Sequence, residues 1–165
     1  MLVQNLLSQG VERVFTLPGA KIDRVLEAIR ALDGKIELIL CRNEQSAAFM
    51  AAGHGRRTGS AGVVLVTSGP GVANLTTSLI TATCEGDAVV AIGGAVPLSQ
   101  RLKRTHQSMD NVGILRPVCK YAVEIDSPLA IGEVIGNAFR NAEEGRPGAA
   151  FVSIPMDVMV DECPE

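Results

Sequence analysis

The chain has 165 residues, of which 47% are hydrophobic and 20% charged, a composition typical of a folded globular protein. Its net charge of −3 offers no basic surface for nucleic acid, and no apolar run approaches the roughly 18 residues that a membrane span requires. The first ten residues lack the basic segment of a secretory signal. We therefore expect a cytoplasmic protein that binds neither nucleic acid nor membrane.

Apolar runs alternate with amphipathic segments along the whole chain. After an amphipathic helix over the first ten residues, the pattern predicts strands at 14–17, 36–40, 61–67, 88–94, 119–125 and 148–155. Helices are predicted between them at 21–32, 43–57, 72–83 and 128–143. This alternation is typical of parallel βαβ units. The sequence predicts an α/β fold over residues 1–165: an open, doubly wound, mainly parallel six-stranded sheet with helices on both faces.

The cysteines match no metal-binding pattern. Cys41, Cys84, Cys119 and Cys163 are separated by 43, 35 and 44 positions, which fits neither a zinc site nor a CxxC motif. Because three of them lie in or beside apolar segments, we expect ordinary buried thiols in a reducing compartment and no metal site in this chain.

Ligands of open α/β sheets bind where the carboxyl ends of the strands meet. Four predicted loops lie at that edge: residues 17–21, 41–45, 67–74 and 106–110. Glu44, in the second loop, has two interpretations. It could simply be a helix-start carboxylate, since the helix macrodipole favours an acidic side chain there. Alternatively, the small residues of the neighbouring loops let a flat ligand approach, and Glu44 shares a proton with a ring nitrogen.

The third and fourth loops also have alternatives. Gly69-x-Gly71-x-x-Asn74 follows a predicted strand and opens a helix, which nearly matches a dinucleotide fingerprint. The next strand ends without the acidic residue that a ribose needs, so a phosphate cradle or a tight structural turn are the alternatives. The segment 95–110 is irregular and basic, so we expect a solvated, mobile loop. His106 lies within it without an obvious Ser or Cys partner for a hydrolase triad.

Taken together, these motifs resemble the N-terminal pyrimidine-binding domain of thiamine-diphosphate-dependent enzymes, and among them the acetolactate synthases of the catabolic, FAD-independent type. The segments that carry the resemblance are VFTLPGAKID (14–23), RNEQSAAFMAAGHGRRTG (42–59), VTSGPGVANL (66–75), EGDAVVAIGG (85–94), HQSMD (106–110), PVCKYAVE (117–124) and GRPGAAFVSIPMDV (145–158). They cover nearly the whole chain in order.

The resemblance implies an activity and a set of site residues. The activity is the condensation of two pyruvates to 2-acetolactate and CO2 through a thiamine-diphosphate ylide, a step of branched-chain amino acid or acetoin biosynthesis. Glu44 corresponds to the glutamate that contacts N1′ of the cofactor's aminopyrimidine, and Gln107 reaches toward the reacting carbon. The other implied cofactor-binding residues are Leu17, Pro18, Gly19, Ala20, Gly71 and Asn74.

The resemblance also implies that the chain is a fragment of a longer three-domain protein. In that family the diphosphate and Mg²⁺ are held by a C-terminal domain of a neighbouring subunit, through a motif that starts with Gly-Asp-Gly and has a downstream Asn. This sequence contains no Gly-Asp-Gly. We therefore expect a homo-oligomer, a dimer or tetramer, and an isolated fragment that is inactive. The alternatives are an FAD-containing, anabolic acetohydroxyacid synthase catalytic subunit, or a non-catalytic α/β module that binds a nucleotide or phosphate.

Overall fold

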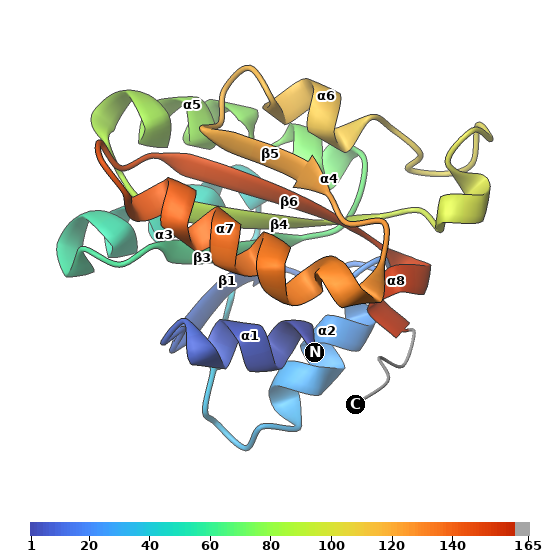
Figure 1. Ribbon diagram of the computed structural model, residues 1–165, viewed down its shortest axis with the longest axis horizontal. Helices are drawn as coiled ribbons and strands as arrows, with labels where there is room; N and C mark the ends of the chain where they lie inside the picture. Colours follow the sequence, from blue (N-terminus) through green and yellow to red (C-terminus); the bar gives the residue numbers. More distant parts are fainter. Residues whose placement is uncertain (161–165) are drawn as a thin grey trace.

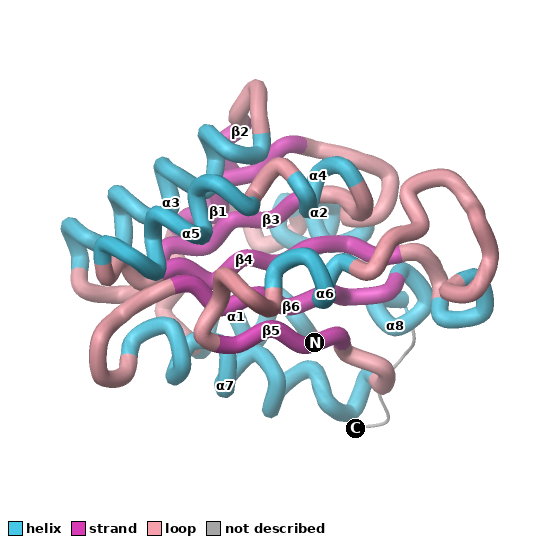
Figure 2. The backbone as a smooth tube through the Cα atoms, turned by 90° about the horizontal axis from the view of Figure 1, so that it is seen from above, coloured by secondary structure: helices cyan, strands magenta, loops and turns pink. Residues whose placement is uncertain are grey.

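The computed structural model describes residues 1–160 and contains a single six-stranded sheet between two layers of helices (Figures 1 and 2). The strands are β1 (Arg13–Leu17), β2 (Glu37–Leu40), β3 (Gly62–Val66), β4 (Val89–Ala95), β5 (Tyr121–Glu124) and β6 (Ala149–Pro155). The α-helices are α1 (Leu2–Ser8), α2 (Asp23–Arg30), α3 (Glu44–Thr58), α4 (Pro70–Ala73), α5 (Thr76–Glu85), α6 (Asn111–Leu115), α7 (Ile131–Glu143) and α8 (Met156–Val160). Short 3₁₀ turns, η1 (Leu98–Gln100) and η2 (Pro128–Ala130), precede α6 and α7.

All neighbouring strands of the sheet are parallel, in the order β2-β1-β3-β4-β6-β5. This confirms the predicted doubly wound α/β fold. The central strands β3, β4 and β6 are buried along their whole length, as expected for strands covered on both faces, whereas the edge strands β2 and β5 are short and only partly covered. The chain moves outward from β1 to β2 and then returns to β3 on the other side. The topological switch point therefore lies between the carboxyl ends of β1 and β3.

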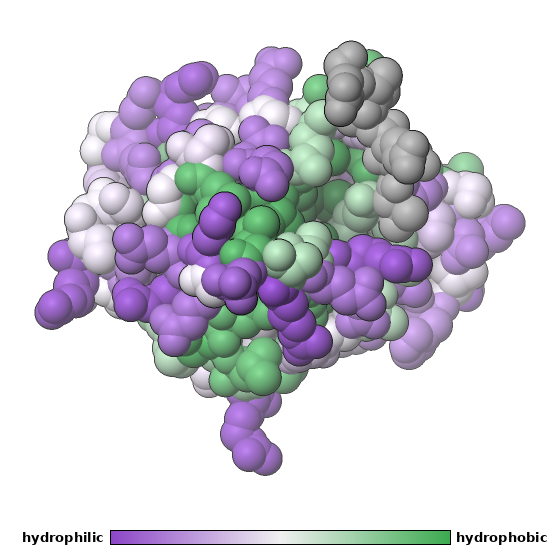
Figure 3. Space-filling model, turned by 90° about the horizontal axis from the view of Figure 1, so that it is seen from below, coloured by the Kyte–Doolittle hydropathy of each residue, from purple (hydrophilic) through white to green (hydrophobic). Residues whose placement is uncertain are grey.

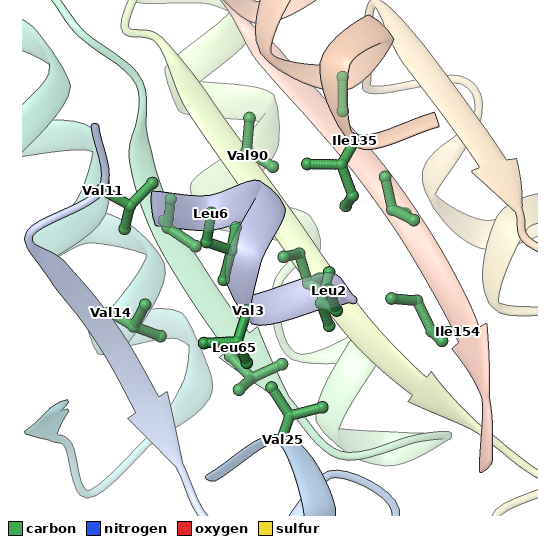
Figure 4. Packing of buried hydrophobic residues seen from close by; sticks show 14 of the residues in the cluster. Leu2, Val3, Leu6, Val11, Val14, Val25, Leu65, Val90, Ile135 and Ile154 are labelled. Carbon is green, nitrogen blue, oxygen red and sulfur yellow. The ribbon is translucent and has the colours of Figure 1, made fainter. Parts of the chain in front are cut away.

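Each face of the sheet has its own apolar core. On one face α1, α2, α7 and α8 pack together, and in Figure 4 Leu2, Val3 and Leu6 of α1 lie over Val14, Leu65 and Val90 of the strands. On the other face α3, α4, α5 and α6 cover a second cluster (Figure 2). Apart from Phe15, Phe139 and Phe151, these cores are aliphatic. Helices therefore cover both faces of the sheet, and its edges and strand ends are the parts that remain open to ligands.

Small residues let α3 approach the sheet more closely than an ordinary helix. Ala47, Ala48 and Ala51 are fully buried. Glycine is required at two contacts, because a Cβ at Gly55 would lie 2.2 Å from the Ala88 carbonyl oxygen and one at Gly62 would lie 2.0 Å from that of Ala51. The close contact fixes α3, and with it the residue at its first position, relative to β3 and β4.

The structure differs from the predicted elements in three places. The helix predicted at 72–83 is two helices, α4 and α5. They meet at Asn74 and Leu75, whose backbones keep right-handed helical dihedral angles although neither residue belongs to a helix. Two five-residue helices, α6 and α8, were not predicted because they are too short to show a periodic apolar pattern. Asp110 begins α6 by accepting a hydrogen bond from the Gly113 amide at 2.7 Å.

The face covered by α1, α2 and α7 carries an apolar region in its middle, surrounded by polar and charged side chains (Figure 3). Met1 is 52% exposed there, and Leu7, Leu32 and Met159 are only partly buried.

Within residues 1–160, none of the helices has the length and hydropathy that crossing a bilayer would demand.

The prediction of buried thiols is wrong for Cys84, which is exposed at the end of α5, while Cys41 and Cys119 are partly buried; Cys163 lies outside the described residues. Burial raises the pKa of the Cys119 thiol to about 12 and also raises the pKa of Cys41. Since the thiolate is the reactive form, we expect iodoacetamide at pH 8 to modify Cys84 first and Cys119 last, as peptide mass spectrometry can measure. Equal labelling rates in the folded protein would contradict this order, and equal rates in urea are the control.

Candidate functional site

The candidate site is built around Glu44, the first residue of α3. Asn43 is the N-cap, and its Oδ1 accepts hydrogen bonds from the amides of Gln45 at 2.9 Å and Ser46 at 3.4 Å. Because the cap residue immediately precedes Glu44, the carboxylate lies in the first turn of the helix, where the macrodipole favours its charge. Glu44 is nevertheless only 8% exposed, which is unusual for a carboxylate without a cationic partner.

A single side chain satisfies one oxygen of this carboxylate. Asn74 donates from Nδ2 to Oε2 of Glu44 at 2.9 Å. Asn74 can reach it because it lies at the junction of α4 and α5, where the helix is interrupted. The contact joins the second and third predicted loops. Across residues 1–160, no protein donor bonds to the other oxygen, Oε1, which is left for a ligand.

Gly71 leaves space directly beside that free oxygen. A Cβ at Gly71 would lie 3.3 Å from Oε1 of Glu44 and 3.0 Å from Cγ2 of Thr67. Any larger residue would therefore press on the carboxylate and on Thr67 together. Gly71 is buried in α4, and its role at the site follows from its lack of a side chain.

The loop after β1 closes the site from the other side of the switch point. A Cβ at Gly19 would lie 2.6 Å from Cβ of Thr67, so Thr67 is held between Gly19 and Gly71. Leu17 ends β1 and is partly buried, whereas Pro18 and Ala20 are exposed and available as a wall. Three of the four predicted loops thus meet around Thr67 and Glu44.

The fourth loop reaches the site through Gln107. Its backbone adopts a left-handed conformation with φ of 64°, which is uncommon for a residue other than glycine. It packs on Gly69, where a Cβ would lie 2.9 Å from the Gln107 carbonyl oxygen. Gly69 itself has φ of 62° and ψ of −117°, a conformation open essentially to glycine alone. His106, which precedes Gln107, is exposed.

Two hydroxyl groups at the site have no partner within the described part of the chain. The hydroxyls of Thr67 and Ser68 are buried, and neither makes a hydrogen bond there. Buried hydroxyls are normally paired, so these are available to a ligand or to water. Both residues lie in the segment VTSGPGVANL, but no role was predicted for them from the sequence. A Thr-Ser pair at the end of a fully apolar strand was the available signal.

The arrangement can hold one edge of a flat heteroaromatic ring. Glu44 offers a buried carboxylate oxygen, Gly71 and Gly19 let a ring approach, and Thr67 and Ser68 add hydroxyls. These groups fit the aminopyrimidine of thiamine diphosphate, whose ring nitrogens require a hydrogen-bonding partner of this kind. In residues 1–160, no three His, Cys, Asp or Glu side chains gather as metal ligands.

Comparison with known families agrees with this geometry. Residues 1–114 match the family described as "Thiamine pyrophosphate enzyme, N-terminal TPP binding domain". The chain belongs to this family. The match extends from α1 to α6 and contains Glu44 and every other residue considered above for the site.

The individual relatives of this thiamine pyrophosphate enzyme domain compared below are all described as acetolactate synthases. The chain is 55% identical to "Acetolactate synthase, catabolic" of Raoultella terrigena and 54% identical to "Acetolactate synthase" of Bacillus subtilis, in each case over 159 residues. It is 40% identical to "Acetolactate synthase isozyme 3 large subunit" of Escherichia coli over the same length. These alignments cover 96% of the chain but only 28% of each relative.

Proposed function

We propose that this chain is the pyrimidine-binding domain of an acetolactate synthase, an enzyme that condenses two pyruvates to 2-acetolactate and CO2. The observation that carries the proposal is the buried Glu44 carboxylate, held by Asn74 on one oxygen and facing Gly71 with the other. The identities of 55% and 54% to acetolactate synthases support the reaction class. The chain spans little more than a quarter of those relatives, so we also propose that it is one domain of a three-domain protein.

Thiamine diphosphate, when bound, would supply the carbanion chemistry that acylation of one pyruvate by another requires. The chain's contribution is to orient the pyrimidine and hold its proton. Glu44 Oε1 would accept the hydrogen bond of the ring N1′, while Asn74 orients the carboxylate through its other oxygen. Pro18 and Ala20 form the adjacent wall, together with Leu17 and Gly19. Gln107, on the loop over Gly69, would face the substrate.

The remaining parts of the site come from outside this chain. We propose that a diphosphate-binding domain of a neighbouring subunit holds the diphosphate and Mg²⁺, which makes the enzyme a homo-oligomer. Exposed apolar side chains on the elements that flank Glu44 support contact with a partner, since Leu40 at the end of β2 is 62% exposed and Met50 and Phe49 of α3 are 46% and 40% exposed. We further propose a cytoplasmic location.

The catabolic, FAD-independent type is favoured over the anabolic type. The relative described as catabolic shares 55% of residues, whereas large subunits from Haemophilus influenzae and Escherichia coli share 42% and 40%. A full-length protein of the proposed type is expected to be colourless, and stoichiometric flavin absorbance would assign it to the anabolic type instead.

The test of the proposal is acetolactate formation by the full-length protein. We expect purified protein, stripped with a chelator, to convert pyruvate to acetolactate only after thiamine diphosphate and Mg²⁺ are both restored. The isolated 165-residue chain is expected to form no product and to bind the cofactor weakly in calorimetry. Cofactor-independent turnover, or tight Mg²⁺-dependent binding to the isolated chain, would contradict the proposed division of the site.

A further inference from the structure

In the loop between β4 and α6, which carries Gln107, the stretch 101–104 has little apolar packing. Arg101, Leu102 and Lys103 are exposed, and Leu102 is 99% exposed. Open surface pockets of about 310 Å³ and 390 Å³ flank the loop, and Arg101 and Glu124 line both of them. Apolar packing therefore contributes little to the position of this stretch, and polar contacts are the ones to consider.

Four polar side chains from four segments form a continuous chain across the base of this loop. Arg101 in the loop pairs with Glu124 at the end of β5. The other oxygen of Glu124 accepts a hydrogen bond from the Ser153 hydroxyl of β6 at 2.8 Å. Asn111 of α6 donates to Ser153 at 3.3 Å and to the Gly94 carbonyl at 3.1 Å. The two residues that bracket the segment 102–110 are thus connected through the same two strands.

The inner half of this network is buried at a cost. Asn111 is 1% exposed and Ser153 is fully buried. Oδ1 of Asn111 is buried and has no hydrogen-bond partner within residues 1–160, which costs the desolvation free energy of that oxygen. An apolar side chain at this position would not have that cost. Packing alone therefore does not explain Asn111, whereas a requirement to fix the end of the loop does.

The network acts on the residue of the loop that contacts the candidate site. Gln107 lies between Arg101 and Asn111 in the sequence, and its strained backbone rests on Gly69. Gly69 opens α4, the helix that places Gly71 beside Glu44. A shift of the loop would therefore move Gln107 relative to the carboxylate.

We propose that Glu124 and Asn111 are positioning residues, which hold the 101–110 loop through the Arg101–Glu124–Ser153–Asn111 chain so that Gln107 stays over Gly69 beside the Glu44 site. This rests on the proposed function, in which Gln107 faces the substrate. The side chain of Arg101 is 50% exposed, so the ion pair adds little to global stability. Its effect is on the geometry of the loop.

The kinetic test uses the full-length protein and a double-mutant cycle. We expect Glu124→Ala to lower kcat/KM by about tenfold to a hundredfold, as misplacement of a contact residue does, with an unchanged melting temperature. The isosteric Glu124→Gln keeps the hydrogen bond from Ser153 but loses the charge. Its kcat/KM is expected to lie between those of the wild type and Glu124→Ala. In a Gln107→Ala background, Glu124→Ala should cost about twofold or less, because the residue through which it acts is gone. A full additional loss in that background would overturn the proposal.

A second measurement does not depend on turnover. Lys103 and Arg104 are trypsin sites within the loop, so its anchoring can be followed as the cleavage rate there. We expect cleavage several-fold faster in Glu124→Ala and Asn111→Ala than in the wild type. Glu37→Gln, which breaks a comparable surface pair with Arg13 at the amino end of β2, is the control and should change neither cleavage nor kinetics.

The two measurements separate the two hypotheses. If the wild-type protein forms no acetolactate, the proposed function fails, and the cleavage rates still test the anchoring of the loop. If acetolactate forms but the Glu124 and Asn111 variants keep wild-type kinetics and cleavage, the positioning role is wrong while the proposed function stands.

Discussion

Replacing Glu44 with glutamine in the full-length protein is expected to reduce acetolactate formation by at least about 10²–10⁴-fold, the range that general acid–base catalysis contributes. Glutamine has the same shape, and its amide oxygen can still accept from Asn74, so the fold should persist. It cannot hold a proton for a ring nitrogen. The measurement is the steady-state rate with pyruvate at saturating thiamine diphosphate and Mg²⁺.

Two matched variants make this result interpretable. Glu44→Asp keeps the charge but withdraws it by one methylene, and it is expected to retain part of the activity. Glu37→Gln removes a carboxylate from the exposed amino end of the neighbouring strand and is expected to have no effect. A wild-type rate in Glu44→Gln would leave Glu44 as a helix-start carboxylate and would favour a non-catalytic α/β module.

The fold and the central part of the site could be predicted because each depends on local sequence. The buried strands β3 and β4 are continuous apolar runs, and β6 is interrupted only by Ser153. Parallel topology then places the loops that follow β1, β2 and β3 at one edge. That reasoning brought Glu44, Gly71 and Asn74 to one place, and the structure joins them within hydrogen-bond and contact distance. Their functional roles stay predictions that the variants above can test.

What could not be predicted depends on contacts between distant segments. The break between α4 and α5 leaves no mark in the sequence, because Asn74 is tolerated in a helix and its reason for being there is a carboxylate 30 positions earlier. The anchoring of the 101–110 loop likewise requires Ser153 and Glu124, which sequence patterns assign only to strands. The mobility expected for this loop remains a prediction, although Arg101 does pair with Glu124.

Burial of thiols was mispredicted for a related reason. Cys84 lies in the last turn of α5, a helix that also contains the apolar residues Leu79, Ile80 and Ala82. Which side of a helix faces the sheet is set by the residues that fit closest to it, here Ser78, Leu79 and Ala82. Composition around a single residue does not carry that information.

The close contact between α3 and the sheet predicts the second large effect. Gly55→Ala should destabilise the domain by about 3 kcal/mol or more, since overpacking of a tight core costs about 1–3 kcal/mol and the new methyl would lie 2.2 Å from the backbone oxygen of Ala88. The helix propensity gained is only about 1 kcal/mol, so the clash outweighs it. Thermal unfolding and soluble yield measure the result.

Gly53 provides a matched control within the same helix, two residues earlier. A Cβ there meets nothing within 4 Å, so Gly53→Ala should be neutral or stabilising by up to about 1 kcal/mol. Because α3 carries Glu44 at its start, a helix displaced by Ala at position 55 should also lose activity in the protein that remains folded, whereas Gly53→Ala should keep it. If both variants proved equally stable and active, α3 would not be held by the contact with Ala88, and the position of Glu44 would need another explanation.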